Sequence, residues 1–89
     1  MLTLRRQKSF AKDLMKVKMS NQHYSKYILY LAKLLNNEIL PTEAKDHSLM
    51  GEYKDTREFH ISGDLILIYF ITDMELVLVR IGTHSQLFN

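Results

Sequence analysis

The chain has 89 residues, of which 46% are hydrophobic, and a formal net charge of +2. A chain this short buries only a little over ~60% of its unfolded surface, which suffices for one core, so residues 1–89 are expected to form a single domain. The absence of cysteine excludes disulfides, thiolate catalysis and cysteine-ligated zinc. No stretch approaches the ~20 consecutive apolar residues of a membrane span, so a cytoplasmic protein is expected.

The charge is unevenly divided along the chain. Residues 1–33 carry eight Lys or Arg against one Asp, a net +7, whereas residues 34–89 carry a net −5. Clustered Lys and Arg release counterions from a phosphate backbone, so the N-terminal part suits a polyanionic partner. A solvated helix surface is the simpler interpretation of the same pattern.

The first predicted elements are a short strand and a helix. Leu2 and Leu4 alternate with polar neighbours as in a strand, which ends in charge at residues 5–6. Over residues 7–18, apolar side chains recur at helical spacing and lysines recur every four residues on another face. The apolar set is Phe10, Leu14 and Val17, and the basic set is Lys8, Lys12 and Lys16.

A second helix is predicted to begin at Ser20 or Asn21, both good N-caps, and to end before Pro41. Its apolar residues share one stripe of helical period, and three further residues lie off that stripe. The stripe consists of Tyr24, Tyr27, Ile28, Leu31 and Leu35, and the residues off it are Lys26, Tyr30 and Lys33.

The C-terminal half reads as a three-strand meander over residues 53–61, 65–72 and 75–81, with turns at residues 62–64 and 72–74. The middle run, LILIYFI, is apolar on both faces and is expected to be the central strand. An N-terminal edge strand, two helices and this meander predict an α+β sandwich. Its single antiparallel sheet would have about four strands, with the helices packed on it.

Three histidines lie at predicted loops or strand ends: His47 in the loop before the sheet, His60 near a strand end and His84 after Gly82. Imidazole titrates near pH 7, so histidines at strand ends can meet as acid and base in one cleft. Each alone is more commonly a surface or half-buried residue, and His23 has no other support. A metal site would require assembly across the fold, since no pair has helical HxxxH spacing.

Alternation along residues 53–61 places Lys54, Thr56, Glu58 and His60 on one face, which is either a titratable surface or an ordinary solvent-facing one. Arg57 faces the other side and is interpreted first as a structural ion-pair partner and second as an RNA contact. On the last strand, Arg80 interrupts the face of Leu76 and Leu78, where it would hold a phosphate or cap the sheet edge.

Three segments resemble the YafQ branch of the RelE toxin superfamily. They are KDHSL at residues 45–49, REFH with DLILIY at residues 57–60 and 64–69, and RIGTHSQLF at residues 80–88. The GTHxxLF ending, together with DHxL and a histidine followed four residues later by aspartate, is the most specific part. The resemblance covers essentially the whole chain and implies a RelE-like fold and a ribosome-dependent endoribonuclease that cleaves mRNA in the A site.

The resemblance also implies which residues act. Catalytic roles would belong to His47, His60, Asp64 and His84, assisted by Arg80 and Phe88. The expected RNA contacts are Arg80, Phe88, Lys45, Lys54, Glu58, Lys8, Lys12 and Lys16, with Lys26 and Lys33 also facing ribosomal RNA. Attack by the RNA 2′-hydroxyl needs acid, base and charge stabilisation, and no cofactor is expected. Relatives often carry Trp where this chain has Leu65, which alters any stacking contact there.

The implied partner is a cognate antitoxin in a heteromeric complex, with DNA reached only through the antitoxin and no membrane involved. One alternative within the same fold is a ParE-like toxin directed at gyrase, and the histidine set argues against it. A second alternative, from a different class, is a non-catalytic binding module, either a degenerate toxin that only engages its antitoxin or a small RNA-binding protein. A third alternative is a metal-binding protein that uses His47, His60 and His84.

Overall fold

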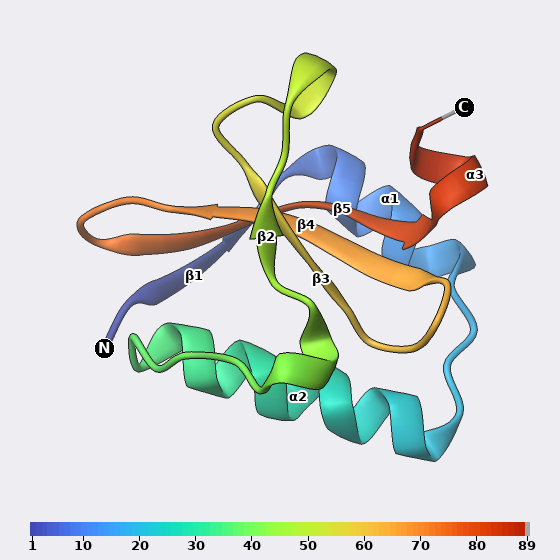
Figure 1. The fold of residues 1–89 in the computed structure, drawn as a ribbon, viewed down its shortest axis with the longest axis horizontal. Coiled ribbons are helices and arrows are strands. Elements are labelled where there is room, and N and C mark those ends of the chain that lie inside the picture. The colour runs from blue at the N-terminus through green and yellow to red at the C-terminus, as the bar shows by residue number, and fades with distance from the viewer. Residues whose placement is uncertain (89) are drawn as a thin grey trace.

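The computed structural model describes residues 1–88, which form one five-stranded sheet with helices beside it (Figure 1). The strands are β1 (Thr3–Arg6), β2 (His47–Ser48), β3 (Arg57–His60), β4 (Leu65–Ile71) and β5 (Glu75–Thr83). The α-helices are α1 (Lys8–Lys16), α2 (Asn21–Leu35) and α3 (His84–Leu87), and single 3₁₀ turns span Thr42–Ala44 and Gly51–Tyr53. The predicted α+β architecture is confirmed.

The strand order is β1-β5-β4-β3-β2, so the apolar run of β4 is the central strand, as predicted. Two features of the sheet differ from the prediction. β1 pairs in parallel with β5, which makes the sheet mixed. This direction is possible because α1 and α2 separate β1 from the meander, so no hairpin forces an antiparallel pairing. A fifth strand, β2, contains two residues and is too short for alternation to reveal.

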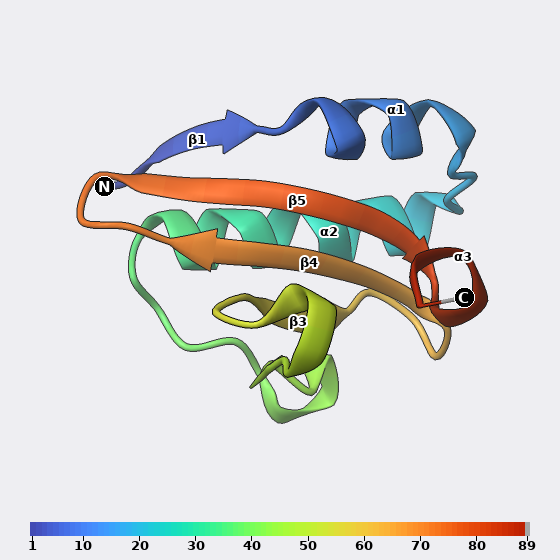
Figure 2. The ribbon, with the colours of Figure 1, turned by 90° about the horizontal axis from the view of Figure 1, so that it is seen from above.

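Helix α1 continues the line of β1 alongside β5 (Figure 2). Where β1 ends, α1 takes over the free edge of β5: the Ser9 hydroxyl donates to the Val79 carbonyl at 2.6 Å, and the Ile81 amide donates to the Asp13 carboxylate at 3.1 Å. Phe10 is fully buried, as the predicted apolar face requires. The helix therefore closes an edge that would otherwise expose unpaired backbone groups.

Helix α2 lies behind β4 and β5 in the view of Figure 2, on the far face of the sheet. Ser20 is its N-cap, as predicted, and its hydroxyl accepts from the His23 amide at 3.1 Å. The predicted apolar stripe is wrong in part: Tyr24 and Ile28, which belong to it, are 50% and 54% exposed. Tyr30 and Leu34, which lie outside it, are 2% and 4% exposed. Both faces have helical period, and the choice between them is made by tertiary packing, in which the Tyr30 ring stands edge-on to Phe59 at 5.6 Å.

The strand register gives the sheet two distinct faces. Phe59, Leu67 and Ile81 lie opposite one another and face α2 as part of the main core. Cross-strand neighbours on the other face form two rows. One row is His47, Glu58, Ile68 and Arg80, and the other is His60, Ile66 and Gly82.

A β-bulge at Val79 decides where Arg80 points. Ile68 pairs with Arg80 and Tyr69 pairs with Leu78, which leaves Val79 as the extra residue of β5. A bulge reverses side-chain alternation beyond it. The predicted alternation is therefore wrong after Leu78: Ile81 joins the core beneath the sheet, and Arg80 lies on the same face as the histidines.

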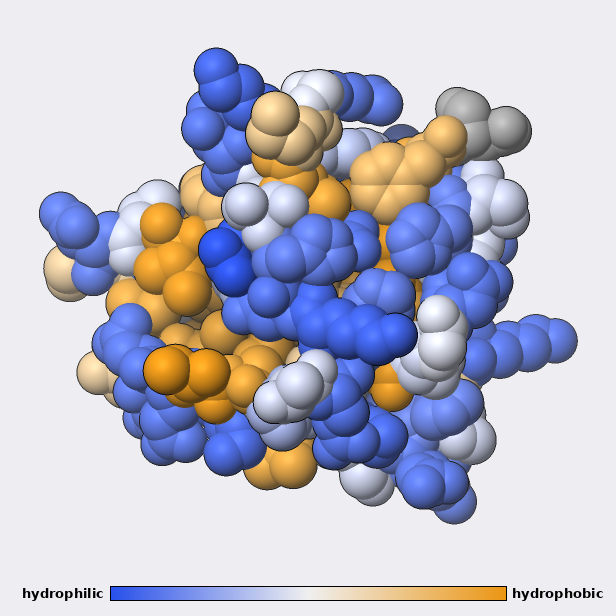
Figure 3. All heavy atoms as spheres, viewed as in Figure 1, coloured by the Kyte–Doolittle hydropathy of each residue, from blue (hydrophilic) through white to orange (hydrophobic). Residues whose placement is uncertain are grey.

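The surface seen from the side of β2 carries hydrophilic residues across its centre and hydrophobic residues to their left (Figure 3). A groove of about 700 Å³ on this side is lined by Leu40, Tyr69 and Ile71 among others. None of the helices within residues 1–88 is long and apolar enough to cross a membrane.

Candidate active site

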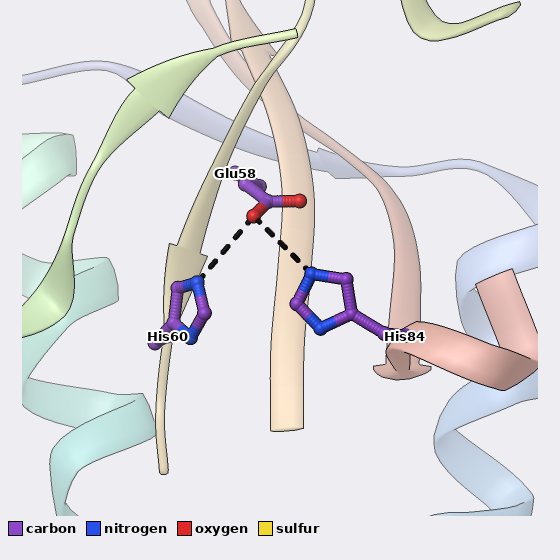
Figure 4. Close-up of side chains that lie close together, drawn as sticks. All are labelled: Glu58, His60 and His84. Carbon is purple, nitrogen blue, oxygen red and sulfur yellow. Dashed lines mark ion pairs between the residues drawn. The ribbon is translucent and has the colours of Figure 1, made fainter. Parts of the chain in front are cut away.

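Three imidazoles meet at one buried carboxylate on the sheet face opposite α2. Glu58 Oε2 lies 3.2 Å from His47 Nε2, 3.4 Å from His60 Nε2 and 3.8 Å from His84 Nε2. Figure 4 shows the Glu58 carboxylate between the rings of His60 and His84. We call His47, Glu58, His60 and His84 the histidine cluster.

The backbone explains why these four residues converge. His47 of β2 is directly opposite Glu58 of β3, and His60 follows two residues later on the same strand and face. His84 begins α3, which a capping box holds: Thr83 Oγ1 accepts from the Gln86 amide, and Gln86 Oε1 accepts from the Thr83 amide. The His47 ring is also oriented by a 2.6 Å contact between its Nδ1 and the Lys45 carbonyl.

Burial divides the histidine cluster into a closed base and an open rim. The Glu58 side chain is 3% exposed and that of His60 is 15% exposed, whereas those of His47 and His84 are 51% and 50% exposed. The second carboxylate oxygen, Glu58 Oε1, is buried and has no hydrogen-bond partner among the described residues. A ligand that approaches from solvent therefore meets the imidazoles first.

Asp64 borders the histidine cluster from the turn that precedes β4. Its Oδ1 accepts from the His84 amide at 3.4 Å and lies 3.7 Å from His84 Nδ1. The two ring nitrogens of His84 thus face different carboxylates, Glu58 on one side and Asp64 on the other. Asp64 is 70% exposed, so the outer side of His84 remains open to a substrate.

The aromatic ring of Phe88 stands beside His84 and contacts that of Tyr53. The Phe88 ring centroid is 5.6 Å from that of His84 and 5.6 Å from that of Tyr53, to which it is edge-on. Phe88 is 43% exposed, so one part of its ring is free to stack on a base.

Arg80 is held in place by two neighbours. Its guanidinium donates to both oxygens of Asp13, at 2.6 and 3.1 Å, and to the Tyr53 hydroxyl at 3.1 Å. The hydrogen bond with Asp13 raises the pKa of Arg80 further above its already high value, against the effect of burial. Arg80 is thus a fixed positive charge on the face that carries the histidine cluster.

The structure brings together His47, His60, Asp64 and His84, with Phe88 beside them and Arg80 on the same face. The structure corrects two expectations about the strand predicted over residues 53–61. Glu58 was expected to face RNA, but it is buried under the imidazoles. Lys54 was expected on the strand, but it ends the 3₁₀ turn before β3 and is exposed.

The remaining basic residues lie at the surface. Lys8, Lys12 and Lys16 are exposed on α1, and Lys45 is exposed at a left-handed backbone position with φ of 51°. Lys26 and Lys33 are near Glu43 and Glu38, at 3.8 and 3.7 Å.

The interpretation of Arg57 as an ion-pair partner is confirmed. It pairs with Asp46 at 3.1 Å, and Tyr69 donates to the same carboxylate.

Sequence reasoning missed Asp13 and Tyr53, which hold Arg80, and it missed Glu58 as the centre of the histidine cluster. One signal for Asp13 was present: it is the only acidic residue among the first 33. Nothing local marks Tyr53, because its role depends on the 3₁₀ turn that folds over the sheet.

Part of the histidine cluster also suits a metal ion. Glu58, His60 and His84 each offer one ligand atom, and these atoms lie within 4.8 Å of one another. Two imidazole nitrogens and a carboxylate are donors that zinc and copper accept.

Comparison with known proteins places this geometry in a family. A family model described as YafQ, a bacterial toxin of type II toxin–antitoxin systems, matches residues 2–89. The mRNA interferase toxin YafQ of Escherichia coli K12 is 38% identical over 80 residues, which cover 89% of this chain and 87% of the relative.

Two solved structures have the same fold. A copper-bound mutant toxin from Helicobacter pylori matches with a TM-score of 0.84 and 40% identity, over 99% of this chain and 100% of that one. The toxin in the E. coli DinJ–YafQ complex matches with a TM-score of 0.85 and 34% identity, over 99% and 98% of the two chains. On the match along residues 2–89 and these similarities, the chain belongs to the YafQ family of bacterial toxins of type II toxin–antitoxin systems.

Proposed function

We propose that the histidine cluster is the nuclease centre of an mRNA endoribonuclease that works in the A site of the ribosome. The observation that carries the proposal is the convergence of three imidazoles on one buried carboxylate, with two of the rings half exposed. Imidazole exchanges protons near neutral pH, and RNA cleavage needs both the acceptance and the donation of a proton. The name of the E. coli relative, an mRNA interferase, supports the same chemistry.

The reaction uses the nucleophile that RNA itself carries. A base removes the proton of the 2′-hydroxyl group, the oxygen attacks the adjacent phosphorus, and an acid protonates the departing 5′-oxygen. His60 or Asp64 would act as the base and His84 as the acid. His84 is suited to the acid role because it is half exposed and held between two carboxylates. General acid–base catalysis of this kind contributes about 10²- to 10⁴-fold.

Charge and stacking complete the proposed site. His47 and Arg80 would stabilise the negative charge that develops on the phosphate. Arg80 is suited to this because Asp13 and Tyr53 fix its position before substrate arrives. Phe88 would stack on a base that is splayed out of the message, since its ring is partly exposed beside His84.

The exposed lysines would dock the protein on the ribosome. Lys8, Lys12 and Lys16 project from α1, and Lys45 and Lys54 project from loops around β2 and β3. Ribosomal RNA presents a dense phosphate surface to which such side chains bind by counterion release. Because the proposed substrate is a translated message, we place the protein in the cytoplasm.

Substitution of His84 tests the nuclease proposal. His84→Ala is expected to abolish cleavage because it removes the proposed acid, whereas Gln22→Ala, at an exposed position on α2, is expected to leave it unchanged. The chain and both variants are induced in a bacterial host, and new mRNA 5′ ends are mapped within minutes. Growth arrest by His84→Ala without new 5′ ends would point instead to a binding or gyrase-directed toxin.

A cognate antitoxin is the proposed partner, as in the DinJ–YafQ complexes of E. coli. The chain offers exposed apolar side chains on α2 and in the loop after it, namely Tyr24, Ile28, Leu29 and Ile39. These lie near the basic part of the chain, so an amphipathic acidic segment of the antitoxin would match both features. DNA would be reached only through the antitoxin.

A second candidate function is metal-dependent inhibition. Glu58, His60 and His84 would hold the ion, and a relative from H. pylori is copper-bound. The buried Glu58 Oε1, which lacks a partner among the described residues, fits this reading. A bound divalent ion can assist a reaction as a Lewis acid. Binding at this site, however, would take the nitrogens of His60 and His84 out of proton transfer, so we expect the ion to inhibit RNA cleavage rather than to activate it.

Titration with Cu²⁺ or Zn²⁺ tests this second function. His84→Ala is expected to weaken the affinity for the ion by more than about tenfold, because one of three ligands is lost. His23→Ala removes an imidazole outside the histidine cluster and is expected to leave the affinity unchanged. Equal affinities of both variants, or cleavage that persists with the ion bound, would contradict inhibition at this site.

A further inference from the structure

A pocket of about 510 Å³ opens beside the histidine cluster, between the C-terminal ends of α1 and β5. Its volume falls within the roughly 300–1,000 Å³ of sites that hold small molecules. Lys16 and Lys18 line one side of the pocket, and Val17, Leu65 and Ile81 supply apolar surface. The histidines of the cluster are not part of its lining.

The charges of the pocket favour an anion. Arg80 also lines it, but both oxygens of Asp13 balance the Arg80 charge, and Asp64 offsets one of the lysines, so the charged side chains of the lining sum to +1. Lys16 and Lys18 are exposed and take part in none of the ion pairs found within residues 1–88, so their charges remain available to a ligand. A pocket with apolar surface beside two ammonium groups matches a nucleotide, whose base is flat and apolar on its faces and whose phosphate is anionic.

Asp64 joins the pocket to the histidine cluster. Its carboxylate lines the pocket and accepts from the His84 amide. Thr83, which immediately precedes His84, also lines the pocket. A nucleotide in the pocket would therefore lie directly next to a phosphate placed at His84.

We propose that this pocket binds the nucleotide that flanks the scissile phosphate of the RNA, with its phosphate at Lys18 and its base over Leu65. This inference rests on the proposed nuclease function, since it names a subsite of the same substrate. The pocket would hold the message next to Asp64, while Phe88 would stack on a base beside His84. Cleavage would then depend on which base fits against Leu65.

The test is an NMR titration of the ¹⁵N-labelled chain with a trinucleotide RNA whose 2′-hydroxyl groups are methylated, so that it binds without being cleaved. The amides of Val17 and Leu65 report on the pocket, and those of His60 and His84 report on the histidine cluster. Lys18→Glu is compared with Arg6→Glu, which makes the same charge change at an exposed position outside the pocket. Circular dichroism of both variants checks the fold.

Both sets of amides are expected to shift in the unsubstituted chain. Lys18→Glu should weaken binding by roughly tenfold through loss of a charged phosphate contact, and Arg6→Glu by no more than about twofold. Shifts at the histidines alone, or equal weakening by both variants, would overturn the pocket assignment and leave the nuclease proposal standing. Unshifted His60 and His84 amides beside shifted Val17 and Leu65 amides would also overturn the assignment, because the pocket would then bind RNA apart from the histidine cluster. The nuclease proposal is tested separately, by His84→Ala in the cell.

Discussion

Glu58 shows how one buried side chain organises the proposed catalytic residues. Its carboxylate contacts three ring nitrogens yet is 3% exposed, so it reaches RNA only through the imidazoles. A buried carboxylate is costly unless polar partners surround it. The three histidines provide such partners for Oε2, and in return this oxygen fixes where their Nε2 atoms point. Glu58 is therefore a positioning residue.

Glu58→Gln tests this role. The amide keeps the size of the side chain but removes its negative charge and leaves a single acceptor oxygen, so the three rings are held less firmly. We expect kcat for ribosome-dependent cleavage to fall by about 10²-fold or more. KM should stay unchanged, since Glu58 does not touch substrate. A change confined to KM in steady-state kinetics would contradict a positioning role.

Asp13 acts at the same scale on Arg80. Its carboxylate binds the guanidinium through both oxygens and also accepts from the Ile81 amide, so it joins α1 to β5 and fixes the cation at once. Asp13→Asn leaves this half-buried cation without its counter-charge. Hydrogen bonds to charged groups contribute about 1.5–3 kcal/mol, and we expect a loss of that order in the free energy of unfolding, measured with urea.

The control for Asp13 is the surface pair of Arg5 and Glu75, whose side chains are 48% and 34% exposed. Glu75→Gln should lower the free energy of unfolding by about 0.2–1 kcal/mol, because solvent screens such pairs. Equal losses in the two variants would mean that Asp13 is an ordinary surface partner.

At the scale of elements, the bulge in β5 and the start of α3 orient the side chains of the proposed site. The bulge at Val79 brings Arg80 to the face that carries Glu58 and His60. After β5, the capping box at Thr83 and Gln86 turns the chain so that His84 and Phe88 project beside that face. Regular strands would have presented Arg80 to the core beneath the sheet.

Gly82→Ala is expected to disturb the start of α3. An added Cβ at Gly82 would lie 2.8 Å from Gln86 Oε1 and 3.2 Å from Leu87 Cδ2, so the Gln86 side chain must move and the capping box loses its bond to the Thr83 amide. We expect reduced cleavage, by roughly tenfold, because a displacement of His84 of even a fraction of an ångström misaligns the acid. Gly63→Ala is the matched control, since an added Cβ there meets nothing within 4 Å. Unchanged cleavage by Gly82→Ala would show that α3 tolerates the shift.

At the scale of the whole molecule, the sheet separates stability from function. The face covered by α2 holds most of the buried apolar residues. The opposite face holds a small apolar cluster around Ile66 and Ile68 and, beside it, the histidine cluster and Arg80. The lysines of α1 lie along the β5 edge. Such an arrangement allows a basic edge to dock on ribosomal RNA while the open face receives the message.

Salt dependence of ribosome binding tests the docking edge. The apparent affinity should fall steeply between about 50 and 200 mM salt, because each phosphate contact releases counterions. Lys12→Ala should reduce the slope of log K against log salt by roughly 1, measured in a His84→Ala background that spares the message. Arg5→Ala should change the slope less, since Glu75 already balances Arg5. Equal slopes for Lys12→Ala and the unsubstituted chain would exclude α1 from the contact.

Local features of the sequence by themselves determined most of the elements. Three features depend on only a few neighbouring residues: the helical spacing of the apolar residues around Phe10, the capping hydroxyl of Ser20 and the apolar run of β4. The elements they mark could therefore be predicted without knowledge of the fold. The resemblance of residues 45–49, 57–69 and 80–88 to the YafQ branch selected the residues that the structure then brings together, His47, His60, Asp64 and His84.

Only the tertiary structure decided the rest. The parallel pairing of β1, the burial of Tyr30 rather than Ile28, and the burial of Glu58 depend on neighbours distant in the chain. Local periodicity has no access to such neighbours, because adjoining helix faces share one period and a bulge reverses alternation without a sequence mark. The order of the residues thus specified what each segment becomes, and packing specified which side chains face one another.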